Sequence, residues 1–141
     1  MNLKPFLKLM VERNASDLFF SPMAPIKIKI EGKIMSVSKD VLSVEAVRDA
    51  ALGLMTESQR ATLEEELEID FAVSEPGLGR FRANVFHQRG NLAIVLRFIT
   101  LDIPELDQLG LPQVLSGLAM EKRGLILMVG ATGSGKSTTL A

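Results

Sequence analysis

The chain has 141 residues, which is enough for one complete domain and the beginning of a second. Its 16 lysines and arginines nearly balance 17 aspartates and glutamates, so the net charge of -1 gives no overall field that would favour nucleic acid, and any anion site must be local. Cysteine is absent, histidine occurs once and no stretch reaches the roughly 20 apolar residues of a membrane span, so we expect a cytoplasmic protein without a disulfide framework or a thiolate metal site.

The first predicted element is an amphipathic helix. Apolar residues recur at the i, i+3, i+4, i+7 and i+8 spacing of one helical face. They are Leu3, Phe6, Leu7, Met10 and Val11. A polar run at residues 14–17 ends this helix.

Strands follow. Residues 18–20 form a short apolar strand, and residues 26–30 alternate between isoleucine and charged side chains, as a half-buried strand does. Gly32 and Lys33 then turn the chain toward residues 34–37, which predicts a β-hairpin.

Two further helices are predicted next. One covers residues 43–54, and the other opens at Thr56, where Gln59 stands three residues on, at the spacing of a capping box.

A second group of strands covers residues 68–73, 80–88 and 92–99. The order of helix, strands, two helices and an antiparallel run of strands predicts an α+β fold, with helices on one face of a mostly antiparallel sheet.

Residues 101–112 carry two prolines and scattered leucines, and we interpret them as a linker between a first domain at 1–100 and a second at 113–141. Pro112 suits the first turn of a helix that reaches about Met120. Residues 125–129 form a continuous apolar run, typical of a buried strand in a parallel sheet.

A phosphate-binding loop comes directly after this run and matches the whole G-x-x-x-x-G-K-[ST] pattern. Glycines allow consecutive N–H groups to wrap a phosphate, and the following helix adds its N-terminal dipole. We expect ATP as ligand, with Lys136 on the β- and γ-phosphates and the Ser137 hydroxyl on Mg²⁺. The alternative is a Gly/Ser-rich turn that binds nothing. The predicted nucleotide-binding residues are Gly130, Ala131, Thr132, Gly133, Ser134, Gly135, Lys136, Ser137 and Thr138.

The chain ends four residues after Ser137, so this piece contains no second acidic strand for magnesium and no base for water. We therefore expect the native protein to continue, and this piece alone not to hydrolyse ATP.

The chain resembles the secretion and pilus motor ATPases along nearly its whole length. The matching segments are Ala15-Ser16-Asp17-Leu18, Gly79-Arg80-Phe81-Arg82, Leu109-Gly110-Leu111-Pro112, Arg123-Gly124-Leu125 and the loop to Thr138. Within this family it is similar to the type IV pilus retraction ATPases. Residues 18–20, 86–89 and 129–132 look more like the PilU type than the PilT type, in which proline commonly stands at the position of Ala131.

This resemblance implies a PAS-like N-terminal domain followed by the start of an α/β RecA-like P-loop domain. It also implies an ATPase that works as a homo-hexameric ring, powers pilus retraction and twitching motility, and lies at the cytoplasmic side of the inner membrane. The implied partners are a homologous retraction ATPase and an inner-membrane pilus platform protein, and not nucleic acid.

Three arginines are predicted to share one face of the sheet. If Arg89 and Gly90 form a two-residue hairpin turn between Gln88 and Asn91, Arg82 falls opposite Arg97. Arg80 then lies on the same face, because side chains alternate along each strand.

The resemblance implies that Arg82 and Arg97 reach the nucleotide phosphates, since arginines of the N-terminal domain do so in this family. Arg82, Arg97 and Lys136 are thus the candidate catalytic residues. The alternative for the arginines is a solvated basic face, or ion pairs with Asp70 and Glu68 on the neighbouring strand.

Two other functions stay open. One is a type II secretion or pilus assembly ATPase. The other is a nucleotide-binding regulatory partner, whose loop is occupied but idle, of a more active homologous motor.

Overall fold

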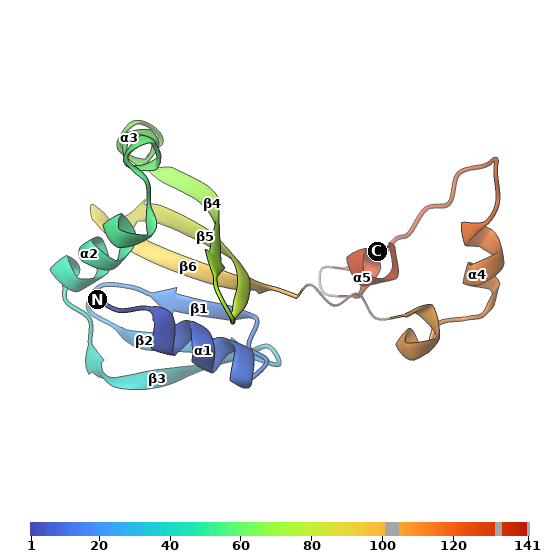
Figure 1. The fold of residues 1–141 in the computed structure, drawn as a ribbon, viewed down its shortest axis with the longest axis horizontal. Helices are drawn as coiled ribbons and strands as arrows, with labels where there is room; N and C mark the ends of the chain where they lie inside the picture. The colour runs from blue at the N-terminus through green and yellow to red at the C-terminus, as the bar shows by residue number, and fades with distance from the viewer. Residues whose placement is uncertain (101–104, 132–133, 141) are drawn as a thin grey trace. The chain divides into compact units, whose positions relative to one another are not determined.

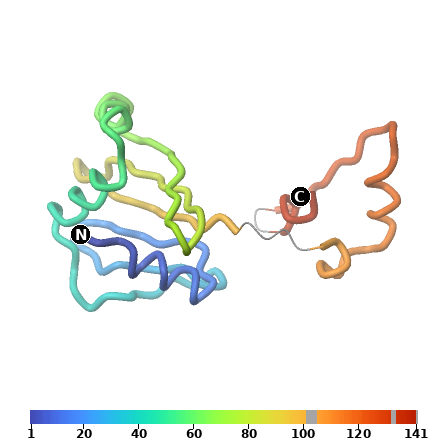
Figure 2. The backbone as a smooth tube through the Cα atoms, viewed as in Figure 1, coloured from blue at the N-terminus to red at the C-terminus, as the bar shows by residue number. Residues whose placement is uncertain are grey.

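The computed structural model describes residues 1–100, 105–131 and 134–140. The chain divides into two compact units, Met1–Thr100 and Leu101–Ala141, which are described separately below (Figures 1 and 2). None of the described helices is long and apolar enough to cross a membrane.

The first unit is built on one six-stranded antiparallel sheet with the strand order β3-β2-β1-β6-β5-β4. Its long connection joins the β1–β3 half to the β4–β6 half and contains two helices (Figure 1). The strands are β1 (Asp17–Phe20), β2 (Pro25–Ile30), β3 (Lys33–Val41), β4 (Glu68–Glu75), β5 (Gly79–Gln88) and β6 (Asn91–Ile99).

One face of this sheet forms the hydrophobic core. Because side chains alternate along a strand, the register places most of the buried positions of the four central strands on a single face. These positions are Leu18, Phe20, Ile26, Ile28, Phe81, Ala83, Val85, Ile94 and Leu96. The opposite face carries the charged side chains of these strands, together with the buried residues Asp17 and Ala93.

Three helices pack beside this sheet: α1 (Lys4–Glu12) beside β1, α2 (Val44–Leu54) beside β6, and α3 (Glu57–Glu66) beside β4 (Figure 1). The buried face of α1 includes Leu7 and Met10, and the ring of Phe6 meets that of Phe20 edge-to-face with 5.9 Å between centroids. The predicted α+β fold is therefore confirmed.

Side-chain caps set the starts of two helices. Ser43 Oγ accepts a hydrogen bond from the Ala46 amide at the start of α2. The predicted capping box is confirmed at the start of α3, where Thr56 Oγ1 accepts from the Gln59 amide and Gln59 Oε1 accepts from the Thr56 amide.

The hairpin of β5 and β6 has the predicted register. Gln88 pairs with Asn91, and the two turn residues Arg89 and Gly90 both have positive φ, 52° and 79°. Two consecutive positive φ angles are typical of a type I′ turn, whose twist matches that of the strands. Arg82 consequently lies opposite Arg97.

The second unit contains a 3₁₀ turn, η1 (Leu106–Leu109), and the helices α4 (Val114–Ala119) and α5 (Lys136–Leu140). The predicted helix near Pro112 is thus present but shorter. Residues 101–104 of the predicted linker lie outside the described residues. The assignment of 113–141 as the start of a RecA-like domain stays a prediction.

The strand predicted at residues 125–129 is absent, and this prediction was wrong. The segment is irregular and exposed; the side chain of Leu125 is 83% exposed and that of Val129 86%. A parallel strand is stable only when neighbours satisfy its backbone groups, and the described part of the second unit has no strand to pair with it.

Candidate functional site

The phosphate-binding loop leads into a short helix in the second unit, as the sequence predicts. Lys136 is the first residue of α5. The amides of Lys136, Ser137 and Thr138 belong to the first turn, where N–H groups have no acceptor within the helix. Thr139 Oγ1 donates to the Gly135 carbonyl at 2.9 Å and closes this turn. Amides and a hydroxyl at a helix start suit a phosphate oxygen.

Two glycines of the loop suit its geometry. A Cβ atom on Gly130 would lie 2.5 Å from Ser134 Oγ, so a larger residue there would force the Ser134 side chain to move. Gly135 has φ of 87°, a conformation that L side chains rarely adopt. Thr132 and Gly133 lie outside the described residues. The described part of the loop therefore fits a phosphate cradle.

Lys136 folds back over the loop. Its Nζ donates to the carbonyl oxygens of Gly130 and Ala131, each at 2.7 Å. No carboxylate pairs with it among the residues that the structure describes. The ammonium charge is thus held in place by neutral acceptors, which suits a group that binds an anion.

Ser137 is exposed in the first turn of α5, beside Lys136. A hydroxyl oxygen is a suitable ligand for the hard cation Mg²⁺. The described residues contain no cluster of three or more acidic, histidine or cysteine side chains that could hold a metal ion by themselves. Magnesium here would depend on Ser137 and on the nucleotide.

A second group of candidate residues lies on the open face of the sheet in the first unit. Arg82 binds Asp70 through two parallel hydrogen bonds, Nε to Oδ1 and Nη2 to Oδ2, each 2.9 Å long. The hydrogen bonds from Arg82 hold the pKa of the Asp70 carboxyl below its usual value, and the nearby charge of Arg97 adds to this effect. The Asp70 carboxylate in turn raises the pKa of Arg82.

Of the two acids expected as possible ion-pair partners of the arginines, Asp70 forms such a pair and Glu68 does not. Arg82 does pair with Asp70 on the neighbouring strand. Glu68 pairs with neither arginine; its Oε1 accepts from Asn84 Nδ2 at 2.9 Å. Arg80 is exposed on the same face, opposite Ile99.

Arg97 has a partner that the sequence reasoning missed. Its Nε donates to Asp17 Oδ1 at 2.8 Å. Asp17 is on β1, directly opposite Arg97 in the register, and it is only 4% exposed. It is the single buried polar or charged residue within the described residues. The sequence signal was an aspartate at the start of an apolar strand.

A pocket of about 340 Å³ brings both predicted arginines together on this face. Polar side chains from β4, β5 and β6 surround it. The lining residues are Glu68, Asp70, Arg82, Asn84, Val95 and Arg97. The phosphate-binding loop belongs to the other unit, so the loop residues and the two arginines form two separate groups of candidate residues.

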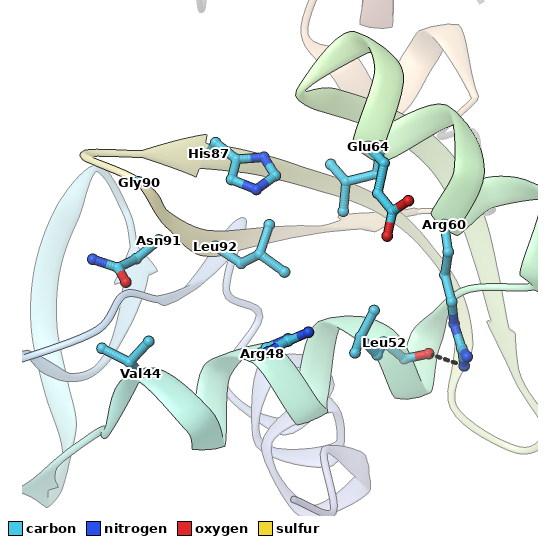
Figure 3. A pocket seen from close by; sticks show the side chains of 10 residues that line it. Val44, Arg48, Leu52, Arg60, Glu64, His87, Gly90, Asn91 and Leu92 are labelled. Carbon is cyan, nitrogen blue, oxygen red and sulfur yellow. Dashed lines mark hydrogen bonds between the residues drawn. The ribbon is translucent and has the colours of Figure 1, made fainter.

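Another pocket, of about 330 Å³, lies between α2, α3 and the β5–β6 hairpin (Figure 3). His87 borders it, with Nδ1 3.3 Å from the Leu67 carbonyl oxygen. Arg60 Nη2 donates to the Leu52 carbonyl at 2.6 Å, near the end of α2. Both side chains contact backbone carbonyl oxygens, which is typical of residues with a structural role.

Known proteins resemble the chain along its whole length. The family described as "Type II/IV secretion system protein" matches residues 2–141. Over 141 residues the chain is 48% identical to the type IV pilus ATPase PilU of Pseudomonas aeruginosa and 36% identical to the type IV pilus retractation ATPase PilT of the same organism. Both alignments include 100% of this chain but only 37% of PilU and 41% of PilT, so the chain spans about two fifths of the length of these relatives.

Solved structures agree with this similarity. The crystal structure of the pilus retraction motor PilT with bound ADP matches with a TM-score of 0.86 and 39% identity, over 99% of this chain and 41% of that one. The structure of the Legionella pneumophila ATPase DotB matches with a TM-score of 0.66 and 27% identity, over 99% and 39%.

Proposed function

Because the chain belongs to the type II/IV secretion system protein family, we propose that it is the ATP-binding part of a hexameric motor ATPase that powers type IV pilus retraction and twitching motility. The phosphate-binding loop carries this proposal. Gly135 has a positive φ that favours glycine, Gly130 leaves room for the Ser134 side chain, and Lys136 stands at the helix start with its charge held only by backbone carbonyls in the described region.

The amides at the start of α5, the Lys136 ammonium group and the Ser137 hydroxyl have separate proposed roles. The backbone amides at the start of α5 bind phosphate oxygens, and Lys136 Nζ exchanges its two carbonyl partners for the β- and γ-phosphates. The Ser137 hydroxyl holds Mg²⁺, which when bound neutralises charge on the phosphates. The loop therefore positions the nucleotide and stabilises its negative charge.

The identities support the pilus assignment over the other functions. Identity is 48% to PilU and 36% to PilT, and it falls to 27% for the ATPase DotB. We therefore favour a PilU-type retraction ATPase over a secretion or assembly ATPase. The proposed setting is the cytoplasmic side of the inner membrane, with a platform protein and a homologous retraction ATPase as partners.

The test is ATP hydrolysis by the full-length protein and by its Lys136→Ala variant. Removal of Nζ should abolish turnover while circular dichroism stays unchanged, because the side chain contacts only two exposed carbonyls in the described region. Lys122→Ala is the matched control, since Lys122 is exposed in the same unit and outside the loop. Equal rates of ATP hydrolysis by the wild type and the Lys136→Ala variant would contradict the proposal.

The same assay distinguishes a motor ATPase from a regulatory partner of another motor. Turnover by the purified protein alone supports a motor. Turnover that appears only after mixing with a homologous retraction ATPase, and that does not depend on Lys136, would instead indicate a partner whose own loop is idle.

A further inference from the structure

Three turns at one end of the six-stranded sheet carry large side chains where the backbone favours glycine. We propose that Leu67 and Glu66 of one copy of the chain bind to Met23 and Arg89 of a second copy. This inference concerns the first unit alone, goes beyond the proposed function and does not depend on nucleotide binding.

The three turns follow one another along the same end of the sheet (Figure 1). One joins β1 to β2 and contains Met23, one joins β5 to β6 and contains Arg89, and the third contains Leu67 and leads into β4. Antiparallel pairing of neighbouring strands brings these turns to one end. β6 ends at Ile99, at the opposite end of the sheet, so the chain leaves the first unit away from these turns.

Each turn holds a residue other than glycine in the left-handed backbone region. The φ angles are 58° at Met23, 63° at Leu67 and 52° at Arg89. Glycine and asparagine adopt this region more readily than residues with larger side chains. Leu67 ends α3, and Arg89 is the first residue of its two-residue turn, positions where glycine or asparagine is usual. Large side chains at such unfavourable positions point to a binding role.

The apolar side chains of Met23 and Leu67 project into solvent from a fixed backbone. The Met23 amide donates to the Leu42 carbonyl at 2.9 Å. The Leu67 amide donates to the Leu63 carbonyl at 2.9 Å, and the Leu67 carbonyl accepts from the His87 amide at 2.9 Å. Met23 is nevertheless 78% exposed and Leu67 57% exposed. Exposed apolar side chains on a rigid backbone suit a protein interface, because little freedom is lost on binding.

Arg89 places a positive charge beside Met23. Both residues line a pocket of about 250 Å³, in which Arg89 is the only charged residue. Within the described residues Arg89 forms no ion pair. The end of β3 carries Lys39 and Asp40, whose opposite charges cancel. The lining residues of the pocket are Pro22, Met23, Gln88, Arg89 and Asn91.

Glutamates place a negative charge beside Leu67. Residues 64–66 are three glutamates in the last turn of α3, which contains no basic residue, and they meet the negative end of the helix dipole. None of them forms an ion pair in the described part of the chain. Glu64 lines the pocket of Figure 3 with two arginines, and Glu68 accepts a hydrogen bond from β5. Glu66, next to Leu67, is thus the group best placed for an external cation.

The two surfaces complement each other. One offers an apolar side chain with a cation, Met23 with Arg89, and the other an apolar side chain with an anion, Leu67 with Glu66. In the strand order, β6 and β5 separate the β1–β2 turn from β4, so the contact does not form within one copy. Because the two surfaces differ, the contact is heterologous and leaves each copy one surface for a third copy, which is compatible with the proposed ring.

The test is crosslinking between differently tagged copies of the full-length protein, co-expressed in a background without other cysteines. One copy carries Gln88→Cys and the other Glu65→Cys, which keeps all four proposed contact residues. A short bismaleimide should join the two copies, and neither variant should crosslink to itself. Lys33→Cys, exposed on β3 at the other end of the sheet, replaces Gln88→Cys in the control. No crosslink, or an equal yield with Lys33→Cys, would overturn the inference.

Charge reversal tests the ion pair between copies. Arg89→Glu in the Gln88→Cys copy should lower the yield roughly tenfold, because it places like charges opposite each other. Glu66→Arg in the Glu65→Cys copy should then restore the yield. Lys33→Glu is the matched reversal outside both surfaces and should change nothing. Failure of Glu66→Arg to restore crosslinking would contradict the pairing.

Leu67→Asn separates the contact from the fold. Asparagine tolerates the left-handed backbone, so this variant should unfold at the same denaturant concentration as wild type, or a higher one. Its crosslinking yield should still fall severalfold, since the apolar side chain that meets Met23 is gone. An unchanged yield would show that Leu67 is outside the contact.

Two further measurements distinguish this inference from its alternatives. Vesicles containing phosphatidylglycerol should not bind the protein through Arg89, because a single arginine beside glutamates suits an anionic membrane poorly. Vesicle binding that Arg89→Glu abolishes, without crosslinking between copies, would assign the surface to a membrane instead. Crosslinking should persist in Lys136→Ala, since both surfaces lie in the first unit. Loss of ATP hydrolysis in Lys136→Ala without any crosslink would overturn this inference and leave the proposed function standing.

Discussion

Arg82 and Arg97 lie directly opposite each other on β5 and β6, although both carry a positive charge. Like charges at opposed positions destabilise a sheet unless something neutralises them. Here the neutralising acids come from the two outer neighbours, Asp70 on β4 and Asp17 on β1. The pair of arginines is thus the centre of a row of charges that crosses four strands.

The Arg82–Asp70 ion pair predicts a specific dependence of stability on pH. Because hydrogen bonds from Arg82 lower the pKa of Asp70 in the folded chain, the pair stabilises the fold fully above the ordinary aspartate pKa of about 3.9. This stabilisation is lost as the pH falls through the lower, folded-state pKa. Both side chains are largely exposed, so the contribution should be small.

Asp70→Asn tests this dependence. Urea unfolding of the 141-residue chain should show the variant slightly less stable than wild type at pH 6 and equal to it in strong acid. Asp49→Asn is the matched control, because Asp49 is exposed on α2 and pairs with no cation in the described residues. A difference that persists unchanged in acid would contradict the assignment.

Gly79 is predicted to resist replacement by alanine. Its φ is 126°, and a Cβ atom there would lie 3.0 Å from the ring of Phe98. Gly79→Ala should therefore lower the free energy of unfolding by roughly 1–3 kcal/mol. Gly53→Ala offers the opposite case, because Gly53 lies in α2 with open space around it, and should raise stability by about 0.5–1 kcal/mol. Equal shifts in the two variants would contradict this reading of the backbone.

The cap of α3 should account for a measurable part of its stability. Thr56→Ala removes the oxygen that accepts from the Gln59 amide and should cost about 1 kcal/mol. Thr62→Ala makes the same change inside the helix, where the hydroxyl donates to the Ser58 carbonyl, and should cost much less. Chemical denaturation of the two variants compares them; similar losses would argue against the capping box.

Ser137→Ala should reduce ATP hydrolysis by the full-length protein roughly tenfold and raise the Mg²⁺ concentration needed for half-maximal turnover, since the proposed ligand for the cation is lost. Ser116→Ala is the control, because Ser116 is exposed in α4 and outside the loop. An unchanged Mg²⁺ dependence in Ser137→Ala would remove Ser137 from the proposed metal site.

Local patterns predicted much of the first unit. The spacing of Thr56 and Gln59 predicted the capping box, and the Arg89-Gly90 turn predicted the pairing of Arg82 with Arg97, because a two-residue turn fixes the register of its hairpin. Both signals depend only on residues close in sequence, so no knowledge of the tertiary fold was needed.

The contact between Asp17 and Arg97 could not be predicted in the same way. The two residues are 80 positions apart and meet only because β1 pairs with β6 across the middle of the sheet. The strand predicted at residues 125–129 failed for a related reason. Its apolar pattern indicates what the segment would do beside other strands, and the described second unit supplies none.

The exposed run at residues 125–129 has a practical consequence for handling the chain. Five successive apolar residues with high strand propensity and no charge have the composition of a segment that stacks into intermolecular β-structure. The 141-residue chain should therefore self-associate as its concentration rises, with these residues as the first site of aggregation. A charged substitution such as Leu127→Lys, which interrupts the run at a side chain that is 74% exposed, should keep it dispersed.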